Sequence, residues 1–389
     1  MTAQEEDAAV GRDGRAGERS ATRPSAIPGY EDWPAFASSA EPFAADDPAV
    51  QSLADVLGLR RMPAAADLER GAPAVHDGVA IIRLTWRTPY GPTTRAWELR
   101  PAAHGSPDGD EERMPGILAL HPHGGRRSTG AAQLIDFDGE NPSAPANRLA
   151  RAGFVVLAHD AFSWDSRRFD LSEPPPKLAR ARDAMLALWA AEGHRPTDAE
   201  VFDAVSSAHE DLVAKAAGVL GQSFAGMVVA DDLVALDVLA GLPAVDQQRI
   251  AALGFSGGGG RAHLLGALDA RVGAVVIACM MATFGSLVPD YLETHSWLLH
   301  SPGLPGLCDW PELASVGCRR ELLVLYGERD PLFPREGMHA AHALLAGVPG
   351  YQGRFFDAGH EFNDEMLGVA IDFLLESRST GARAQLPAR

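Results

Sequence analysis

Short apolar runs alternate with helix-like stretches along most of this chain, and this alternation constrains its fold more than any other feature. Strands that are buried on both faces have such uninterrupted apolar sequences, and they belong to parallel sheets flanked by helices. The apolar runs are residues 116–120, 154–158, 250–255, 274–279, 322–326 and 354–357, and the helix-like stretches include residues 224–240, 260–268 and 335–346. The sequence therefore predicts the α/β fold class, with a doubly wound, mostly parallel sheet.

Two further segments are expected to complete this domain. Residues 79–88 and 94–101 resemble two antiparallel strands at one edge of the sheet, separated by a Pro-Tyr-Gly-Pro turn. A long connection at about residues 162–221 interrupts the alternation. Because long connections in compact domains are usually lids or binding loops, we expect a cap insertion over the active-site end of the sheet.

The ends of the chain differ in composition from its body. Residues near the N-terminus are Ala, Gly, Pro and charged residues with almost no large apolar side chains, whereas Trp33 and Phe36 begin a mixed segment. Segments that cannot bury apolar surface stay disordered. We expect a disordered leader at 1–28, a helical N-terminal extension at 29–75, a main domain at 76–378 and a disordered tail at 379–389.

The charge balance argues against two classes of partner. The chain has 34 Lys and Arg against 52 Asp and Glu, a formal net charge of −18. Nucleic acids and anionic membranes attract concentrated positive charge, so we expect neither as a partner.

The longest nearly unbroken apolar run, residues 274–282, is about half as long as a membrane span, and no secretory signal is visible. The three cysteines are too few and scattered for a disulfide framework. A cytoplasmic protein is expected.

The sequence Gly254-Phe255-Ser256-Gly257-Gly258 is the strongest chemical signal. It lies between an apolar strand and a predicted helix. A nucleophile on a sharp strand-to-helix turn needs small neighbours two residues before and after it, because the turn is strained and packs tightly. The pattern alone is weak in a chain with 40 glycines, but its position predicts Ser256 as a nucleophile. The alternative is a glycine-rich turn with an incidental serine.

A serine hydroxyl needs a base and an orienting acid, which should follow it in the order Ser, Asp, His. Asp330 lies at the end of the apolar run 322–326, and His360 follows the run 354–357. The ends of parallel strands are where catalytic groups collect, so we predict Asp330 as the acid and His360 as the base. Asp160, which ends another strand, is the rival candidate for the acid. We expect it instead to support, from below, the loop of residues 121–125, here called the oxyanion loop.

An oxyanion hole should accompany these three residues. One donor is expected to be the backbone N–H of Gly257, the residue after the nucleophile. The other should come from His121-Pro122-His123-Gly124-Gly125, which follows the first buried strand. We predict the amide of His123, with Gly124 as the alternative, since Pro122 has no N–H.

Other residues permit weaker hypotheses. His121 and His123 could be misread as a metal site, but no third or fourth ligand stands at suggestive spacing, so no metal is expected. Four residues near predicted strand ends could shape a substrate cleft, with core packing as the alternative for each: Phe162, Trp164, Met281 and Trp297.

With these motifs the chain resembles the α/β-hydrolase superfamily, and within it the branch of acetyl xylan esterases, dienelactone hydrolases and prolyl-oligopeptidase-like proteins. The resemblance covers roughly residues 79–375. The residues that carry it are 121–125, 153–160, 245–258, 326–331 and 359–362. It implies an α/β-hydrolase fold, with Ser256 as nucleophile, Asp330 as acid, His360 as base and no cofactor.

The function that follows is a serine hydrolase that cleaves a small-molecule carboxylic ester with a short, acetyl-type acyl group through an acyl-enzyme. The same three residues also serve peptidases and acyltransferases. However, peptidases of the prolyl-oligopeptidase type usually carry a large N-terminal propeller, and the region before residue 79 is too short for one. A third hypothesis is a non-catalytic binding protein on the same scaffold; such proteins typically lose one of the three residues.

Overall fold

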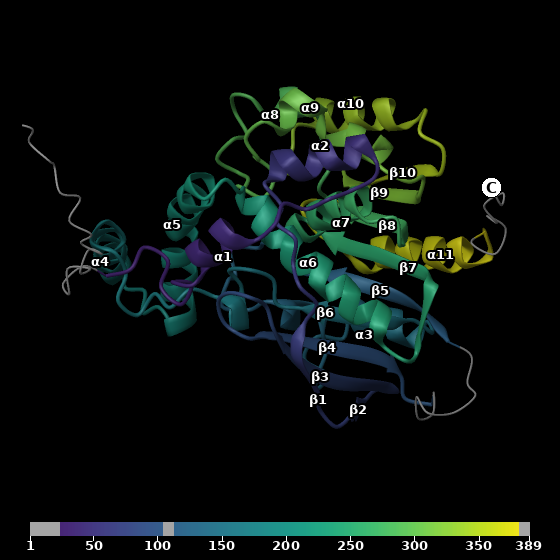
Figure 1. Ribbon diagram of the computed structural model, residues 1–389, viewed down its shortest axis with the longest axis horizontal. Helices are drawn as coiled ribbons and strands as arrows, with labels where there is room; N and C mark the ends of the chain where they lie inside the picture. The colour runs from purple at the N-terminus through teal and green to yellow at the C-terminus, as the bar shows by residue number, and fades with distance from the viewer. Residues whose placement is uncertain (1–23, 104–112, 381–389) are drawn as a thin grey trace, which may run out of the picture.

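A single mixed sheet organises the protein (Figure 1). The structure is a computed structural model and describes residues 24–103 and 113–380. In this part of the chain, β1-β3-β4-β6-β5-β7-β8-β9-β10 are neighbours in that order, and β2 pairs with β3. The strands are β1 (Ala66–Arg70), β2 (Ala74–His76), β3 (Val79–Arg87), β4 (Thr94–Pro101), β5 (Met114–Leu120), β6 (Val155–His159), β7 (Val245–Phe255), β8 (Val272–Ala278), β9 (Glu321–Gly327) and β10 (Tyr351–Phe356).

The direction of the strands divides the sheet into two parts. β5 to β10 are parallel, whereas β1 to β4 form an antiparallel edge that joins the rest through the β4–β6 pair. The predicted α/β class with a mostly parallel, doubly wound sheet is confirmed. The strand order reverses at β5, which pairs with β6 on one side and β7 on the other. Ligands of such sheets bind at the carboxyl ends of the strands beside this reversal.

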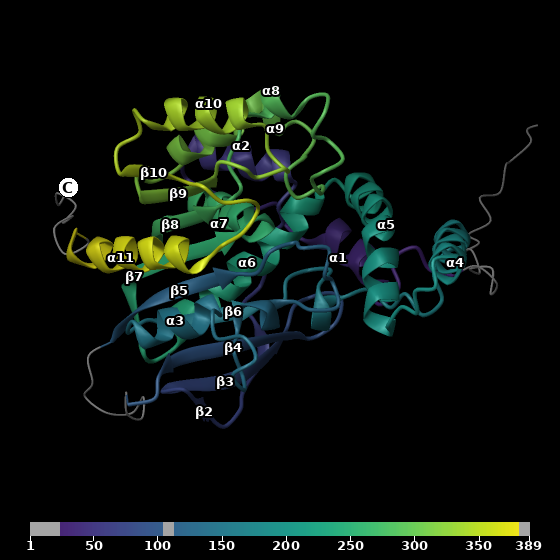
Figure 2. The same cartoon turned by 180° about the vertical axis from the view of Figure 1, so that it is seen from behind.

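Helices cover both faces of the sheet (Figures 1 and 2). The alternation of side chains along β5 shows why its sequence is apolar throughout: Leu118 and Leu120 belong to one buried cluster, and Ile117 and Ala119 to the other. The helices are α1 (Trp33–Ser39), α2 (Pro48–Leu57), α3 (Pro145–Arg151), α4 (Pro176–Ala191), α5 (Asp198–Val219), α6 (Phe224–Gly241), α7 (Gly257–Leu268), α8 (Phe284–Leu287), α9 (Leu304–Leu307), α10 (Arg335–Leu345) and α11 (Asp364–Thr380), with short 3₁₀ turns η1 (Ala131–Leu134), η2 (Asp165–Arg167) and η3 (Trp310–Ser315).

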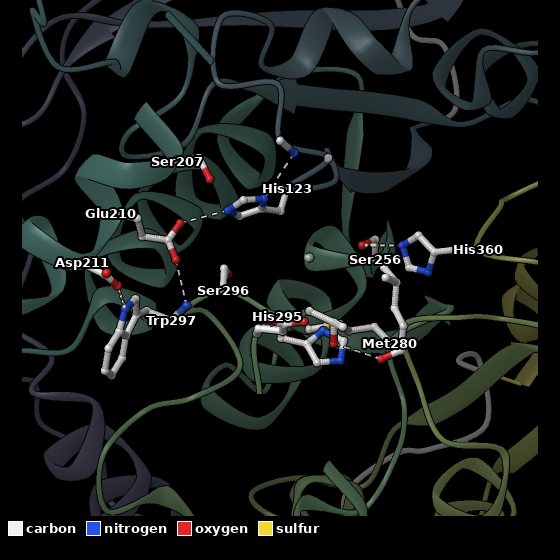
Figure 3. Close-up of a pocket in the computed structure, with 16 residues that line it drawn as sticks. His123, Ser207, Glu210, Asp211, Ser256, Met280, His295, Ser296, Trp297 and His360 are labelled. Atoms are coloured by element: carbon white, nitrogen blue, oxygen red, sulfur yellow. Dashed lines mark hydrogen bonds and ion pairs between the residues drawn. The ribbon is translucent and has the colours of Figure 1, made fainter. Parts of the chain in front are cut away.

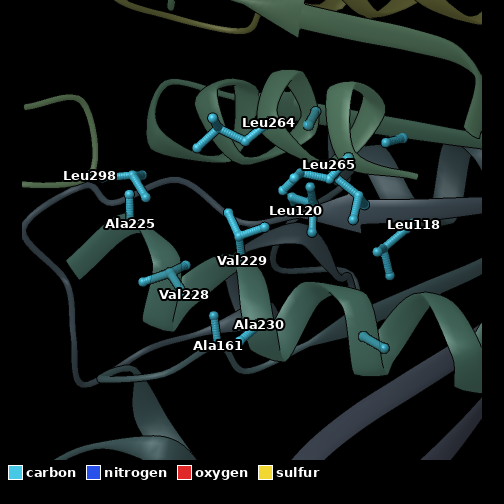
Figure 4. Close-up of a cluster of buried hydrophobic side chains, with 14 of the residues drawn as sticks. Leu118, Leu120, Ala161, Ala225, Val228, Val229, Ala230, Leu264, Leu265 and Leu298 are labelled. Carbon is cyan, nitrogen blue, oxygen red and sulfur yellow. The ribbon is translucent and has the colours of Figure 1, made fainter. Parts of the chain in front are cut away.

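The larger cluster fills the space between the sheet, α6 and α7 (Figure 4). Val228 and Val229 of α6 lie there with Leu264 and Leu265 of α7. Most residues of α6 are buried all round, so this helix has no polar face. A helix with this burial belongs to the interior of a protein.

Two adjacent carboxylates of α6 are nevertheless buried. Asp231 lies 3.0 Å from Nε of Arg167. Arg261 of α7 donates two hydrogen bonds to Asp232, and its remaining nitrogen donates to the backbone oxygen of His121. Burial opposes the ionisation of Asp232, but the charge of Arg261 outweighs it and lowers the pKa of Asp232 to about 2. These pairs therefore connect α6 to α7 and to two loops at the carboxyl ends of the strands.

The connection between β6 and α6 is the segment that was expected to form a cap, and the name cap is kept for it. Its helices α4 and α5 form a hairpin that projects from the body of the molecule (Figure 1). In the extension, Trp33 of α1 donates through Nε1 to Gln222 at the base of the hairpin. The end of α2 lies so close to α6 that a Cβ at Gly226 would stand 2.2 Å from the backbone oxygen of Leu57. The extension is thus attached both to the cap and to the body.

The structure corrects the expectations for the chain ends. Residues 24–28 were expected in the disordered leader, but the backbone oxygen of Ala26 accepts a hydrogen bond from His209, and that of Pro28 accepts one from Asp170. The extension is helical only in its first part, because β1 and β2 pair with β3 and belong to the sheet. α11 continues to Thr380, two residues into the expected tail. Leader residues 1–23 and tail residues 381–389 lie outside the described part of the chain.

No helix within residues 24–103 and 113–380 combines the length and the apolar character that crossing a membrane requires.

The buried pair predicts a large effect of one substitution in α6. Asp232→Ala leaves Arg261 as an uncompensated buried cation, so we expect the free energy of unfolding to fall by about 3–5 kcal/mol. Asp237 on the same helix pairs with Arg271 at 2.8 Å, but its side chain is 51% exposed. Asp237→Ala should therefore cost less than about 1 kcal/mol. Urea denaturation at pH 7 measures both values, and equal losses would contradict the assigned role of the Asp232 pair.

Candidate active site

Ser256 lies in a strained turn between β7 and α7. Its backbone has φ 53° and ψ −128°, which non-glycine residues rarely adopt. A Cβ at Gly258 would stand 2.0 Å from the backbone oxygen of Leu120, and one at Gly254 would stand 2.1 Å from the backbone of Gly258. The glycines on both sides of Ser256 are therefore required by close backbone approaches, as the motif predicted.

Ser256, His360 and Asp330 form one chain of hydrogen bonds (Figure 3 shows its first link). Nε2 of His360 lies 2.8 Å from Oγ of Ser256, and Nδ1 lies 2.7 Å from Oδ2 of Asp330. A neutral His360 with its proton on Nδ1 donates to Asp330 and accepts from the Ser256 hydroxyl. The Asp330 side chain is fully buried, and its other oxygen accepts from the backbone N–H of Leu332. The structure thus brings together the three residues that the sequence placed on separate strand ends.

The loops that carry Asp330 and His360 approach each other closely. A Cβ at Gly327, the last residue of β9, would stand 2.3 Å from the backbone oxygen of Gly359. The rings of Phe255 and His360 are in contact, with centroids 4.9 Å apart. The close backbone approach holds the two loops together, and the Phe255 ring supports the imidazole of His360.

Asp160 is occupied elsewhere. It accepts hydrogen bonds from the backbone N–H groups of Ala131 and Ser166 and lies 3.5 Å from Arg95. Burial raises the pKa of this carboxyl. Its contacts order two loops, as the structural alternative expected, and none of them involves His360.

The backbone of His123 lies close to Gly257, the residue after Ser256. The backbone nitrogen of His123 would stand 3.0 Å from a Cβ at Gly257. Among the residues that the structure describes, no acceptor takes the amide hydrogen of His123, Gly124 or Gly257. Gly257 also begins α7, where the helix dipole favours negative charge. The turn of Ser256 and the loop of His123 thus bring unpaired backbone donors close together.

The imidazoles of His121 and His123 have separate partners. Nδ1 of His121 lies 3.0 Å from the backbone oxygen of Pro122, and Nε2 accepts from the backbone N–H of Ala161. Burial lowers the pKa of His121, so this ring is neutral. Nε2 of His123 lies 2.9 Å from Oε2 of Glu210. Across residues 24–103 and 113–380, no three His, Cys, Asp or Glu side chains gather in a way that could hold a metal ion.

A cavity of about 530 Å³ opens over Ser256 and His360 (Figure 3). The cap, the oxyanion loop and the segment after β8 all contribute to it. Its lining residues are His123, Gly124, Gly125, Ser207, Glu210, Asp211, Ser256, Gly257, Met280, Glu293, Thr294, His295, Ser296, Trp297, Leu332 and His360. Burial lowers the pKa of His295 to about 4, so this side chain is neutral at pH 7.

Of the four expected cleft residues, Trp297 lines the cavity and three do not. Phe162 is completely buried against the rings of Tyr30 and Trp33, where it holds the N-terminal extension. Trp164 is buried beneath His123. Met281 is buried in the core, and its neighbour Met280 lines the cavity instead. The prediction was wrong for these three because nearness to a strand end does not decide which way a side chain points.

Glu210 is the residue of the site that the sequence analysis missed. It lies on α5, within the expected cap, and is buried. Burial opposes its ionisation, but the charge of Arg127 and the hydrogen bond of His123 outweigh it and lower the pKa of Glu210 to about 2. Its signal in the sequence is its position: Ser206, Val213 and Ala217 of the same helix are buried at spacings of three and four residues, on the face that contains Glu210.

Comparison with known proteins gives one sequence relative and several structural ones. No protein-family model matches the chain. It is 26% identical over 258 residues to "Putative hydrolase YtaP" of Bacillus subtilis (strain 168). The aligned region covers 66% of this chain and 74% of that protein.

Solved structures of esterases share the fold at low sequence identity. Methylesterase BT1017 has a TM-score of 0.55 and 17% identity, covering 90% of this chain and 70% of the other. The acetyl xylan esterase from Paenibacillus sp. R4 has a TM-score of 0.51 and 16% identity, covering 88% and 98%. The glucuronoyl esterase from Solibacter usitatus has a TM-score of 0.52 and 14% identity, covering 85% and 91%. Together with the mostly parallel sheet and the helices on both of its faces, these similarities show that the protein has the α/β-hydrolase fold.

Proposed function

We propose that this protein is a serine hydrolase that cleaves carboxylic esters. The observation that carries the proposal is the hydrogen-bonded chain from Ser256 through His360 to the buried Asp330. A base within hydrogen-bond reach of a hydroxyl, itself oriented by a third group, is the arrangement that activates a nucleophile. The similarity to YtaP, named as a hydrolase, and to solved esterases supports the same reaction class.

The proposed reaction begins with attack of Ser256 Oγ on the ester carbonyl carbon. Nε2 of His360 takes the hydroxyl proton, and Asp330 stabilises the imidazolium that forms. The carbonyl oxygen becomes an oxyanion, which accepts hydrogen bonds from the amides of Gly257 and His123, with Gly124 as the alternative second donor. The C–O bond to the alcohol then breaks as His360 gives its proton to the leaving oxygen.

The acyl-enzyme is resolved by the same groups in reverse. His360 takes a proton from a water molecule, and the resulting hydroxide attacks the acyl carbon. The second oxyanion collapses, the bond to Ser256 Oγ breaks, and His360 returns the proton to the serine. The products are a carboxylic acid and an alcohol, and no cofactor is required.

The lining of the cavity favours a polar ester with a short acyl chain. Met280, Leu332 and Trp297 are its large apolar residues, whereas most of the others carry hydroxyl, imidazole or carboxylate groups. A long alkyl chain gains free energy only from apolar surface that it can cover. We therefore propose acetyl-type esters of small, polar molecules as substrates.

Replacement of the nucleophile tests the proposal directly. Ser256→Ala should lower kcat for p-nitrophenyl acetate on the order of 10⁴-fold or more, since the three residues act as a unit. A fluorophosphonate probe should label the wild type and leave Ser256→Ala unlabelled. Ser207→Ala, which removes another hydroxyl from the cavity lining, should keep most of the activity. Wild-type labelling of Ser256→Ala, or activity at a tenth of the wild type, would refute Ser256 as the nucleophile.

The acid can be identified with two matched substitutions. Asp330→Asn should lower kcat by about 10⁴-fold with little change in KM, because the side chain orients the imidazole without touching substrate. Asp160→Asn should mainly lower stability, since Asp160 orders loops. Steady-state kinetics and thermal unfolding separate the two effects. A near-neutral Asp330→Asn beside a catalytically severe Asp160→Asn would reverse the assignment.

Acyl-chain length tests the proposed substrate class. The highest kcat/KM is expected for p-nitrophenyl acetate or butyrate, with falling values for longer chains. Each added methylene offers about 0.8 kcal/mol of burial, but a mostly polar cavity cannot supply the contacts. A series from C2 to C16, kept below the micellar concentration, measures this. A maximum at C8 or longer, or a jump in rate above the micellar threshold, would contradict the proposal.

A further inference from the structure

Glu210 occupies the point where the cap meets both walls of the cavity (Figure 3). Its Oε2 lies 2.9 Å from Nε2 of His123 in the oxyanion loop and also pairs with Arg127. Its Oε1 accepts a hydrogen bond of 2.8 Å from the backbone N–H of Trp297 on the opposite wall. One buried carboxylate of α5 therefore interacts with three residues from two segments, the loop after β5 and the segment after β8.

The contacts of His123 leave its side chain no freedom. Its Nδ1 accepts a hydrogen bond from the backbone N–H of Gly125, which leaves Nε2 to donate to Glu210 at 2.9 Å. Arg127, which pairs with the same Glu210 oxygen, lies 3.1 Å from Nε2 as well, so the ring, the carboxylate and the guanidinium form one cluster. The indole of Trp164 packs edge-on against the ring, and its Nε1 donates to the backbone oxygen of His123. The ring and the carbonyl are thus held, while the amide hydrogen, next to Gly257, has no partner among the described residues.

We infer that Glu210 is a positioning residue for the oxyanion hole: by holding the imidazole of His123, it holds the amide of that residue where the oxyanion forms. This inference rests on the proposed ester hydrolysis. Donors that are fixed before the reaction stabilise the transition state most, because no reorganisation is needed when the charge develops. Loss of the contact should therefore reduce kcat and leave ground-state binding of a small ester nearly unchanged.

The alternative is that Glu210 only attaches the cap to the body, and Asp203 provides the matched control for it. Asp203 lies two turns earlier on the same helix and accepts hydrogen bonds from the backbone N–H and the hydroxyl of Ser128, at 2.7 and 2.8 Å. Asp203 therefore attaches α5 to the connection after β5, which also contains His123 and Arg127, without contacting His123. A role in attachment alone would make Asp203→Asn and Glu210→Gln equivalent.

The test compares Glu210→Gln, His123→Asn, the double variant and Asp203→Asn in the full chain, with p-nitrophenyl acetate as substrate. His123→Asn keeps the backbone amide and leaves the pair of Glu210 and Arg127 intact, so it remains informative if Glu210→Gln does not fold. We expect each of the two single variants to lower kcat at least about 10-fold, a fraction of the 10²–10³-fold loss of a whole oxyanion donor, with KM within about 3-fold. The affinity for a trifluoromethyl ketone, which forms a tetrahedral adduct with serine, should fall in parallel.

The double variant should lose no more activity than the more severe single variant, because each single substitution already removes the contact between Glu210 and His123. Asp203→Asn should stay within about 2-fold of the wild type in kcat. The inference is overturned if His123→Asn keeps wild-type kcat, if the two losses multiply, or if Asp203→Asn loses as much as Glu210→Gln. Ser256→Ala in the same assay separates the two proposals: wild-type turnover by that variant refutes ester hydrolysis by Ser256, whereas its inactivity beside a fully active His123→Asn refutes only the role of Glu210.

Discussion

The paired aspartates of α6 are the constraint on which the geometry of the site depends. Asp231 and Asp232 are buried beneath the carboxyl ends of the strands, where an unpaired charge would be costly. Each therefore binds an arginine from a different segment, Arg167 after β6 and Arg261 on α7. Arg261 also donates to the backbone oxygen of His121. The ion pair of Asp232 and Arg261, with the hydrogen bond from Arg261 to His121, thus joins α6, α7 and the loop after β5.

The same principle explains how the strained serine is maintained. An unfavourable backbone conformation such as that of Ser256 persists only when its surroundings determine it fully. Here the backbone of Gly258 fits against Leu120, the amide of Ser256 donates to Ala278 on the neighbouring strand, and Arg261 anchors the following helix. The hydroxyl is therefore aimed at His360 by the packing of the sheet and helix.

The sequence predicted the elements that are determined locally and missed contacts made between distant segments. Buried strands have apolar sequences, and Asp330 and His360 follow two of them. The sequence alone therefore suggested that these residues meet Ser256, and the structure places the three within hydrogen-bond distance. In contrast, the order of residues 24–28 depends on His209, more than 180 positions away. Met280 and Met281 follow a strand end, where the two-residue period of the strand no longer decides which side chain faces the cavity. Glu210 was hidden for a similar reason, because its partners Arg127 and His123 lie in another segment.

The two helices of the cap consequently differ in their relation to the site. α4 packs against α5 and has a single fully buried residue, Leu178, so its charged surface faces solvent. α5 lies between α4 and the body, and its inner face supplies Ser207, Glu210 and Asp211 to the cavity. Glu210 interacts with both His123 and the backbone N–H of Trp297, so α5 is joined to both sides of the cavity. Under the proposed function, α5 would thus serve both the substrate cavity and the amide of His123, whereas α4 contributes no residue to the cavity lining.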